Sequence, residues 1–165
     1  GFLTRRVYVY MESPVGALKL VAHDQALVAV MWDNEDHKRV RLAELIENIQ
    51  HPMLLKVKQQ LEQYFAGQRQ QLNLPLDFQG TDFQQQVWRA LLTIPYGETR
   101  SYKDVALQIG NEKAVRAVGA ANGRNPISII APCHRVIGSS GALVGFAGGL
   151  DKKQILLSLE QGQIQ

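Results

Sequence analysis

Cysteine is nearly absent from this chain of 165 residues, which contains Cys133 alone. A single cysteine excludes an internal disulfide framework and any zinc site built from clustered cysteines. The four histidines are scattered without metal-ligand spacing, so we expect no bound metal. No apolar run approaches the roughly 20 residues that span a bilayer, and no signal-peptide pattern is visible. We therefore expect a reducing, cytoplasmic setting without membrane contact.

Net charge is also small, at +3, and it is unevenly distributed. Residues 1–78 carry 9 basic and 9 acidic side chains, whereas residues 79–165 carry 9 basic and 6 acidic ones. Six basic residues lie between positions 100 and 135, against two acidic residues. Such a segment fits a polyanionic partner, although an ordinary solvated face would look the same.

The first half of the chain predicts a small sheet followed by helices. Residues 5–11, 17–22 and 26–32 have strand patterns separated by short turns, which predicts an antiparallel meander. Apolar residues at helical spacing predict one helix over residues 38–50 and a second that begins at Pro52. A polar, aperiodic stretch then connects two expected lobes, residues 1–78 and residues 79–165.

The second half begins with helix signals. Thr81 starts a capping-box pattern, and Ser101 with Asp104 forms a second one. Gly110 is a natural helix stop, so residues 101–122 predict a helix, a tight turn and a second helix. Two helices of this length, separated by a short glycine turn, are typical of a helix-turn-helix.

Three further elements are expected downstream of this pair. The apolar run at residues 127–131 predicts a short strand, and the glycine-rich residues 139–149 predict a flexible loop. Asp151 with Gln154 predicts the capped start of a last helix.

The second helix of the pair is unusual because its outward positions are mostly Ala and Gly. It reads EKAVRAVGAANG, with Lys113 and Arg116 as its long side chains. A major-groove reader presents several long polar groups to base edges, whereas small residues allow close backbone approach, as in a narrow minor groove. A helix half-buried against a neighbour would also suit small residues, so both interpretations stay open.

Cys133 lies in the stretch IIAPCHRVIG, beside His134 and between apolar residues. It could be a small core residue, a metal ligand or a nucleophile. A nucleophilic role needs a base, and a buried histidine base needs a third group that orients it. Glu160 is the candidate, because it is the only acidic residue after Asp151.

The segment PCHRV, preceded by NGRNPISIIA and followed by GGLDKKQILLSLEQG, resembles the O6-alkylguanine-DNA alkyltransferases. FQQQVWRALLTIPYGETRSY and AVRAVGAANGRNP occur in the family's order, and SPVGALKLVA and LEQYFAG match more loosely. The resemblance implies an α+β fold. A ribonuclease-H-like antiparallel sheet lobe would be followed by a helical, winged helix-turn-helix-like domain that binds DNA and carries the site.

The resemblance also implies a role for each residue of the reaction centre. Cys133 would accept the alkyl group, His134 would deprotonate it through a water, and Glu160 would orient His134. Asn125 would brace the segment by hydrogen bonds. Tyr102 would rotate the DNA phosphate and donate a hydrogen bond to N3 of the guanine.

The same resemblance implies the DNA and base contacts. Arg116 would enter the base stack in place of the flipped nucleotide. Further DNA contacts are expected from Tyr102, Lys113, Ala117, Ala120, Asn122, Gly123, Arg124 and Arg135. In the base pocket, the carbonyls of Val136 and Cys133 would accept hydrogen bonds from the guanine amino group. The Ala147 N–H would donate to the alkylated oxygen. Phe146 would form a wall of the pocket, and Gly148 would also line it.

These expectations together describe a repair protein that reacts once. The partner would be double-stranded DNA with an alkylated guanine, with O4-alkylthymine as a further substrate, and no cofactor or metal would be needed. The protein is expected to be a monomer in solution that can cluster along DNA. Two alternatives are a lesion-binding protein, against which the cysteine argues, and a transcription regulator, for which the Ala/Gly-rich helix offers few base-reading groups.

Overall fold

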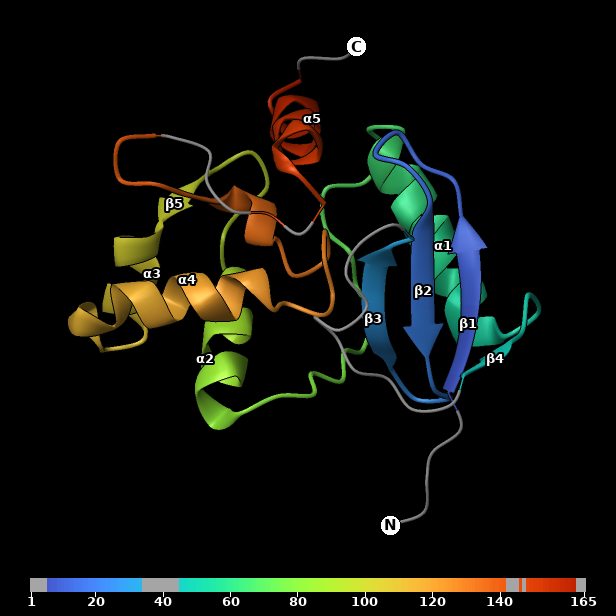
Figure 1. The fold of residues 1–165 in the computed structure, drawn as a ribbon. Coiled ribbons are helices and arrows are strands. Elements are labelled where there is room, and N and C mark those ends of the chain that lie inside the picture. The colour runs from blue at the N-terminus through green and yellow to red at the C-terminus, as the bar shows by residue number, and fades with distance from the viewer. Residues whose placement is uncertain (1–5, 34–44, 142–145, 147, 163–165) are drawn as a thin grey trace. The chain divides into compact units, whose positions relative to one another are not determined.

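The computed structural model describes residues 6–33, 45–141, 146 and 148–162. The chain divides into two compact units, residues 1–78 and residues 79–165 (Figure 1).

The N-terminal unit is built on a four-stranded sheet with the strand order β3-β2-β1-β4. Its strands are β1 (Arg6–Met11), β2 (Leu18–Ala22), β3 (Leu27–Trp32) and β4 (Leu45–Glu47). The first three strands pair antiparallel, as the meander prediction requires. β4 pairs parallel with β1, so the sheet is mixed and not purely antiparallel.

The helix predicted over residues 38–50 is wrong where the structure can test it. Residues 45–47 form β4, and residues 38–44 lie outside the described residues. Leu45 packs against the apolar cluster that contains Val21 and Met31, and the Asn48 N–H donates to the Tyr8 carbonyl. Pairing with an exposed strand edge has therefore overridden a helical spacing of apolar residues.

Helix α1 (Pro52–Phe65) covers one face of this sheet (Figure 1). It begins at the predicted Pro52, and the His51 side chain caps it by accepting from the Met53 N–H. The helix buries Leu54, Val57 and Leu61 against the strands, as the apolar spacing predicts.

The C-terminal unit is mainly helical. Its elements are α2 (Asp82–Leu91), β5 (Arg100–Ser101), α3 (Tyr102–Gln108), the short 3₁₀ helix η1 (Glu112–Ala114), α4 (Val115–Gly123), η2 (Cys133–Arg135), β6 (Val136–Ile137) and α5 (Leu150–Glu160). Both predicted capping boxes, at Thr81 and Ser101, are present. Gly110 has a φ of 79°, the left-handed value that a turn between α3 and α4 requires.

A buried tryptophan holds α2 against the helix pair. The Trp88 Nε1–H donates to the Ala121 carbonyl of α4 at 2.8 Å, and Trp88 is 2% exposed. Val105 of α3 and Val118 of α4 are buried in the same unit. α2 therefore supports the helix-turn-helix. A side chain that binds a partner needs such support to keep its position.

The start of α5 differs from the prediction. The helix begins at Leu150, and Gly149, with a φ of 97°, occupies the N-cap position without a side-chain cap. The expected cap by Asp151 is therefore wrong, because Asp151 already lies inside the first turn.

Candidate active site

The segment that carries Cys133 is shaped by Asn125. The Asn125 Nδ2 donates to the Ala131 carbonyl at 2.8 Å, and its Oδ1 accepts from the Ile127 N–H at 3.0 Å. These bonds close residues 125–131 into a compact loop, and Asn125 is 1% exposed. The strand predicted at residues 127–131 is therefore wrong, because the Asn125 side chain binds backbone groups that a sheet would use.

Two tight turns complete this loop. The Ile130 N–H donates to the Ser128 carbonyl at 2.8 Å across Ile129, whose φ is 74°. A β-branched residue rarely adopts that conformation, which costs on the order of 1–3 kcal/mol and persists only where surrounding contacts enforce it. The Cys133 N–H then donates to the Ala131 carbonyl at 2.8 Å, and η2 begins at Cys133 itself. The thiol is thus held on a strongly constrained backbone.

Glu160 of α5 binds two side chains of η2. Its Oε2 lies 2.7 Å from the His134 Nε2, and its Oε1 lies 2.7 Å from the Arg135 Nε. The Arg135 Nη2 also donates to Oε2, at 3.0 Å. The side chains of His134 and Glu160 are 0% and 1% exposed. The predicted histidine–carboxylate pair is therefore present and shielded from solvent.

The surroundings of the pair favour a neutral His134 beside an ionised Glu160. Burial lowers the pKa of His134 below its ordinary value, against the hydrogen bond and charge of Glu160, which raise it. Burial would raise the pKa of Glu160, but its contacts with His134 and Arg135 outweigh burial and lower that pKa to about 2. A neutral His134 then donates from Nε2 to an ionised Glu160. Its buried Nδ1 has no hydrogen-bond partner within the described part of the chain, and it is left as an acceptor.

Arg135 is not placed as predicted. We expected it to contact DNA, but it is 7% exposed and its guanidinium binds Glu160 and the Ile94 carbonyl. It also lies over the Tyr96 ring, with Cζ 5.7 Å from the ring centroid. A guanidinium committed to these partners cannot also reach a phosphate, so Arg135 supports the Glu160 carboxylate from inside the unit.

Tyr102 and Asn122 approach Cys133 from the helix pair. Burial raises the pKa of the half-buried Tyr102, the charge of Cys133 raises it further, and a side-chain hydrogen bond with Asn122 lowers it. The Asn122 Nδ2 lies 3.4 Å from the Cys133 carbonyl, and Asn122 is 3% exposed. Asn122 was predicted to contact DNA, and its burial corrects that prediction. It links α4 to the cysteine segment.

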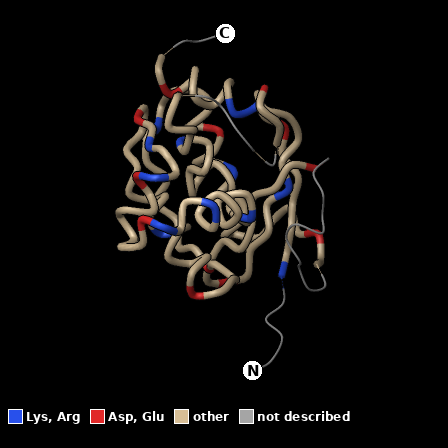
Figure 2. The backbone as a smooth tube through the Cα atoms, turned by 60° about the vertical axis from the view of Figure 1, so that its left-hand side comes forward, with Lys and Arg blue, Asp and Glu red and all other residues tan. Residues whose placement is uncertain are grey.

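The remaining DNA candidates lie on one exposed face of α4 and its flanks. These residues are Lys113, Arg116, Ala117, Ala120, Gly123 and Arg124, and all are exposed. The opposite face buries Val118 and Ala121. Ala117, Ala120 and Gly123 therefore leave the exposed face open to a partner, whereas Ala121 packs inside the unit, so α4 is half-buried and both interpretations apply to different faces of it. In Figure 2 basic and acidic positions are interspersed along the tube, so charge alone does not single out this face.

The predicted pocket residues are only partly described. Val136 is buried in β6, Phe146 and Gly148 are partly exposed, and Ala147 lies outside the described residues. Sequence reasoning missed Lys153, which is 0% exposed and donates from Nζ to the Val136 carbonyl at 2.6 Å. The sequence signal that could have indicated its burial is its position seven residues before Glu160, because residues two helical turns apart lie on the same face of a helix.

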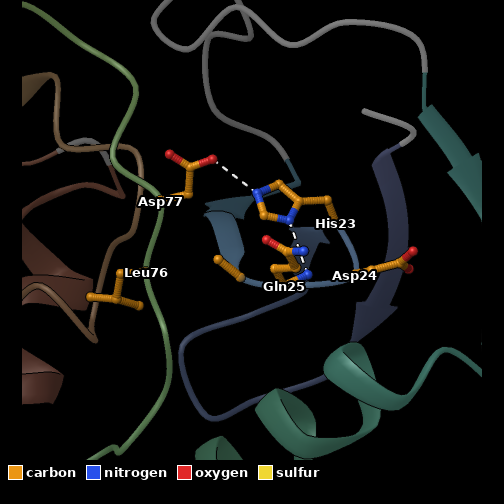
Figure 3. A pocket seen from close by; sticks show the side chains of 6 residues that line it. His23, Asp24, Gln25, Leu76 and Asp77 are labelled. Carbon is orange, nitrogen blue, oxygen red and sulfur yellow. Dashed lines mark hydrogen bonds and ion pairs between the residues drawn. The ribbon is translucent and has the colours of Figure 1, made fainter. Parts of the chain in front are cut away.

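A hollow with a volume of about 490 Å³ lies within the N-terminal unit, apart from the cysteine segment (Figure 3). It is lined by His23, Asp24, Gln25, Ala26, Leu76 and Asp77. The His23 Nε2 lies 2.9 Å from an Asp77 oxygen, and its Nδ1 accepts from the Gln25 N–H. The Nε2 bond holds Asp77, while the Nδ1 bond closes the turn at Gln25, and backbone bonds of Leu27 with Pro75 and Asp77 fix residues 75–77 beside β3. The described residues contain no cluster that could hold a metal ion. Within the same residues, no helix combines the length and apolar character needed to cross a membrane.

Comparison with known proteins assigns both units. Residues 6–78 match the family described as 6-O-methylguanine DNA methyltransferase, ribonuclease-like domain. Residues 82–162 match the 6-O-methylguanine DNA methyltransferase, DNA binding domain. The chain belongs to the 6-O-methylguanine DNA methyltransferase family. The family assignment confirms the resemblance and the predicted fold class.

Individual relatives agree over nearly the whole length. A methylated-DNA–protein-cysteine methyltransferase of Mycobacterium leprae is 49% identical, over 93% of this chain and 92% of that protein. The constitutive methylated-DNA–protein-cysteine methyltransferase of Bacillus subtilis is 46% identical, over 93% and 94%. The crystal structure of Mycobacterium tuberculosis OGT in complex with DNA has a TM-score of 0.87 and 46% identity, covering 95% of this chain and 94% of that one.

Proposed function

We propose that this 6-O-methylguanine DNA methyltransferase repairs DNA by moving the alkyl group of O6-alkylguanine onto Cys133. The protein is an enzyme of DNA repair whose family transfers a methyl group from O6-methylguanine to a cysteine. One observation carries the assignment to this residue: Cys133 begins η2 and is followed directly by His134, whose Nε2 lies 2.7 Å from the buried Glu160 Oε2. The chain also contains no other thiol.

The reaction is a single in-line displacement. His134 Nδ1 takes the thiol proton through a bridging water, and the resulting thiolate is the nucleophile. The sulfur forms a bond to the alkyl carbon as the bond from that carbon to O6 breaks, and the electron pair moves into the guanine. The thiol proton ends on the guanine, so the products are unmodified guanine and S-alkylcysteine. A thioether has no leaving group that this site can activate, so the protein reacts once.

Tyr102 supplies a hydrogen bond to the departing base. Burial and the neighbouring Cys133 raise the pKa of its phenol, which keeps the hydroxyl protonated and able to donate. Donation to guanine N3 stabilises the negative charge that develops on the base. The Ala147 N–H would act in the same way at O6, with Phe146 and Gly148 beside the base and the carbonyls of Val136 and Cys133 accepting from its amino group.

The alkylated base must leave the duplex to reach a buried thiol. Cys133 is 4% exposed, so a stacked base cannot approach the sulfur. The exposed small residues of α4 suit a minor groove, which the backbone can approach closely. Arg116 on this face fills the gap that the flipped nucleotide leaves, while Lys113 and Arg124 contact the backbone. Tyr102 also turns the phosphate during flipping.

The remaining proposals concern the cofactor requirement, the cellular location, the oligomeric state and a second substrate. The displacement uses only the thiolate, the alkylated base and a proton acceptor, so we propose that it needs no cofactor or metal. The protein would act in the cytoplasm on chromosomal DNA, as a monomer that can cluster along the duplex. O4-alkylthymine is a second proposed substrate, because it carries the same kind of alkyl–oxygen bond.

The test is the intact mass of the protein after incubation with a duplex that contains one O6-methylguanine. We expect a gain of one methyl group per protein, located on Cys133 by peptide mapping. Cys133→Ala should gain no mass while it still binds the duplex, because its DNA face is intact. Binding without any gain in the wild type would instead support a lesion-binding protein, and methylation of another residue would overturn the mechanism.

A further inference from the structure

Lys153 is a buried cation that the proposed mechanism does not use. It lies on α5 with 0% exposure, and its Nζ donates to the Val136 carbonyl at 2.6 Å. Burial of an ammonium is costly unless fixed partners compensate it. Burial lowers the pKa of Lys153, while the charge of Cys133 raises it. Phe146 is also close, with its ring centroid 6.0 Å from Nζ.

The carbonyl that Lys153 binds has weak support from its own strand. β6 is two residues long and pairs with the two-residue β5. Val136 follows η2 directly, and its N–H donates to the Cys133 carbonyl. The position of the Val136 carbonyl relative to the sulfur therefore depends on one turn of 3₁₀ helix, on the short pairing with β5 and on the ammonium of Lys153.

A carbonyl at this place can distinguish guanine from a purine without an amino group. The exocyclic amino group of guanine is a hydrogen-bond donor and needs an acceptor in a water-poor pocket. A carbonyl oxygen has two lone pairs, so an oxygen that binds Lys153 can accept a second hydrogen bond. The acceptor is effective only if it is held at the correct distance and angle.

We propose that Lys153 is a positioning residue that holds the Val136 carbonyl where it reads the amino group of the alkylated guanine, and so sets base specificity. The inference rests on the proposed function. Lys153 and Glu160 lie seven residues apart on one face of α5, so this face positions both the base His134 and the reading carbonyl.

The experiment compares two duplexes that carry the same methyl group. One contains O6-methylguanine and the other contains O6-methylhypoxanthine, which lacks the amino group. The readout is the ratio of the two transfer rate constants for the wild type, for Lys153→Met and for the matched control Lys152→Met. Lys152 is the adjacent lysine on α5 and is partly exposed.

We expect the wild type and Lys152→Met to prefer O6-methylguanine by the same factor. In Lys153→Met the preference should fall about fivefold to tenfold, the order expected for one misplaced hydrogen bond. Equal slowing on both duplexes would overturn the proposal, because a purely structural or charge effect would not depend on the amino group. A wild type without preference would overturn it as well.

If Lys153→Met does not fold, Lys153→Arg serves in its place. The planar guanidinium keeps the charge but cannot occupy the same point 2.6 Å from the carbonyl, so the preference should still fall. An unchanged preference in folded Lys153→Arg would overturn the proposal. A wild type that transfers no methyl group from either duplex would refute the proposed function itself, which is a distinguishable result.

Discussion

Replacing Glu160 by glutamine tests the buried network in a single step. Glutamine keeps the shape of the side chain but removes the charge that faces His134 and Arg135. The Arg135 side chain is 8% exposed and carries a guanidinium cation. The variant therefore leaves a buried guanidinium without its anion, and it leaves His134 without the carboxylate that orients it.

Both consequences can be given a magnitude. Removing one partner of a buried ion pair costs about 3–5 kcal/mol. For a unit of this size each kcal/mol corresponds to roughly 4 °C or more, so we expect the melting midpoint of residues 79–165 to fall by about 12 °C or more. Loss of an oriented general base should slow transfer by about a hundredfold or more.

The assay combines thermal unfolding with single-turnover transfer from an O6-methylguanine duplex. Glu98→Gln is the matched control, because Glu98 pairs with Arg100 at 3.1 Å while 54% of its side chain is exposed. An exposed pair contributes about 0–1 kcal/mol, so this variant should resemble the wild type. If Glu160→Gln matched Glu98→Gln in both stability and transfer, the assignment of Glu160 would be refuted.

Two further predictions concern the DNA face and the response to acid. Arg116→Ala should slow transfer from a duplex about tenfold or more while sparing the isolated base O6-benzylguanine, because only a duplex requires flipping. The exposed Arg89→Ala serves as the control, and equal losses on both substrates would count against a role in the base stack. The folded-state pKa values of His134 and Glu160 both lie below their ordinary values of 6.5 and 4.5, so the unfolded chain binds more protons. Stability should therefore decline as pH falls from 6.5 towards 2, and urea midpoints that stay constant over this range would contradict the assignment.

Local sequence signals were reliable where short-range interactions decide the structure. Ser101 and Asp104 predict a capping box, and both of its hydrogen bonds are present. Gly110 predicts the turn of the helix pair and has the required positive φ. The three-strand meander is equally local, because its turns join strands that are adjacent in the sequence. Each of these features depends on residues a few positions apart, which a sequence displays directly.

Features that depend on distant partners could not be read in this way. Residues 45–47 have a helical spacing, but the open edge of β1 turns them into a strand. Residues 127–131 have the composition of a strand, but Asn125 takes the backbone groups that a sheet would use. In both cases a contact elsewhere in the fold outweighs the local preference, which amounts to less than about 1 kcal/mol per residue.

The sequence by itself determined the family and singled out Cys133, His134 and Glu160 as candidates for its site, because these residues stand in a specific order along the chain. Only the tertiary structure decided which polar residues face inwards. Arg135, Asn122 and Lys153 look like surface residues in the sequence, yet each is at most 7% exposed and binds within the unit. The physical reason is compensation: a polar group can be buried only where another segment supplies its partner, and that partner is known only once the chain has folded.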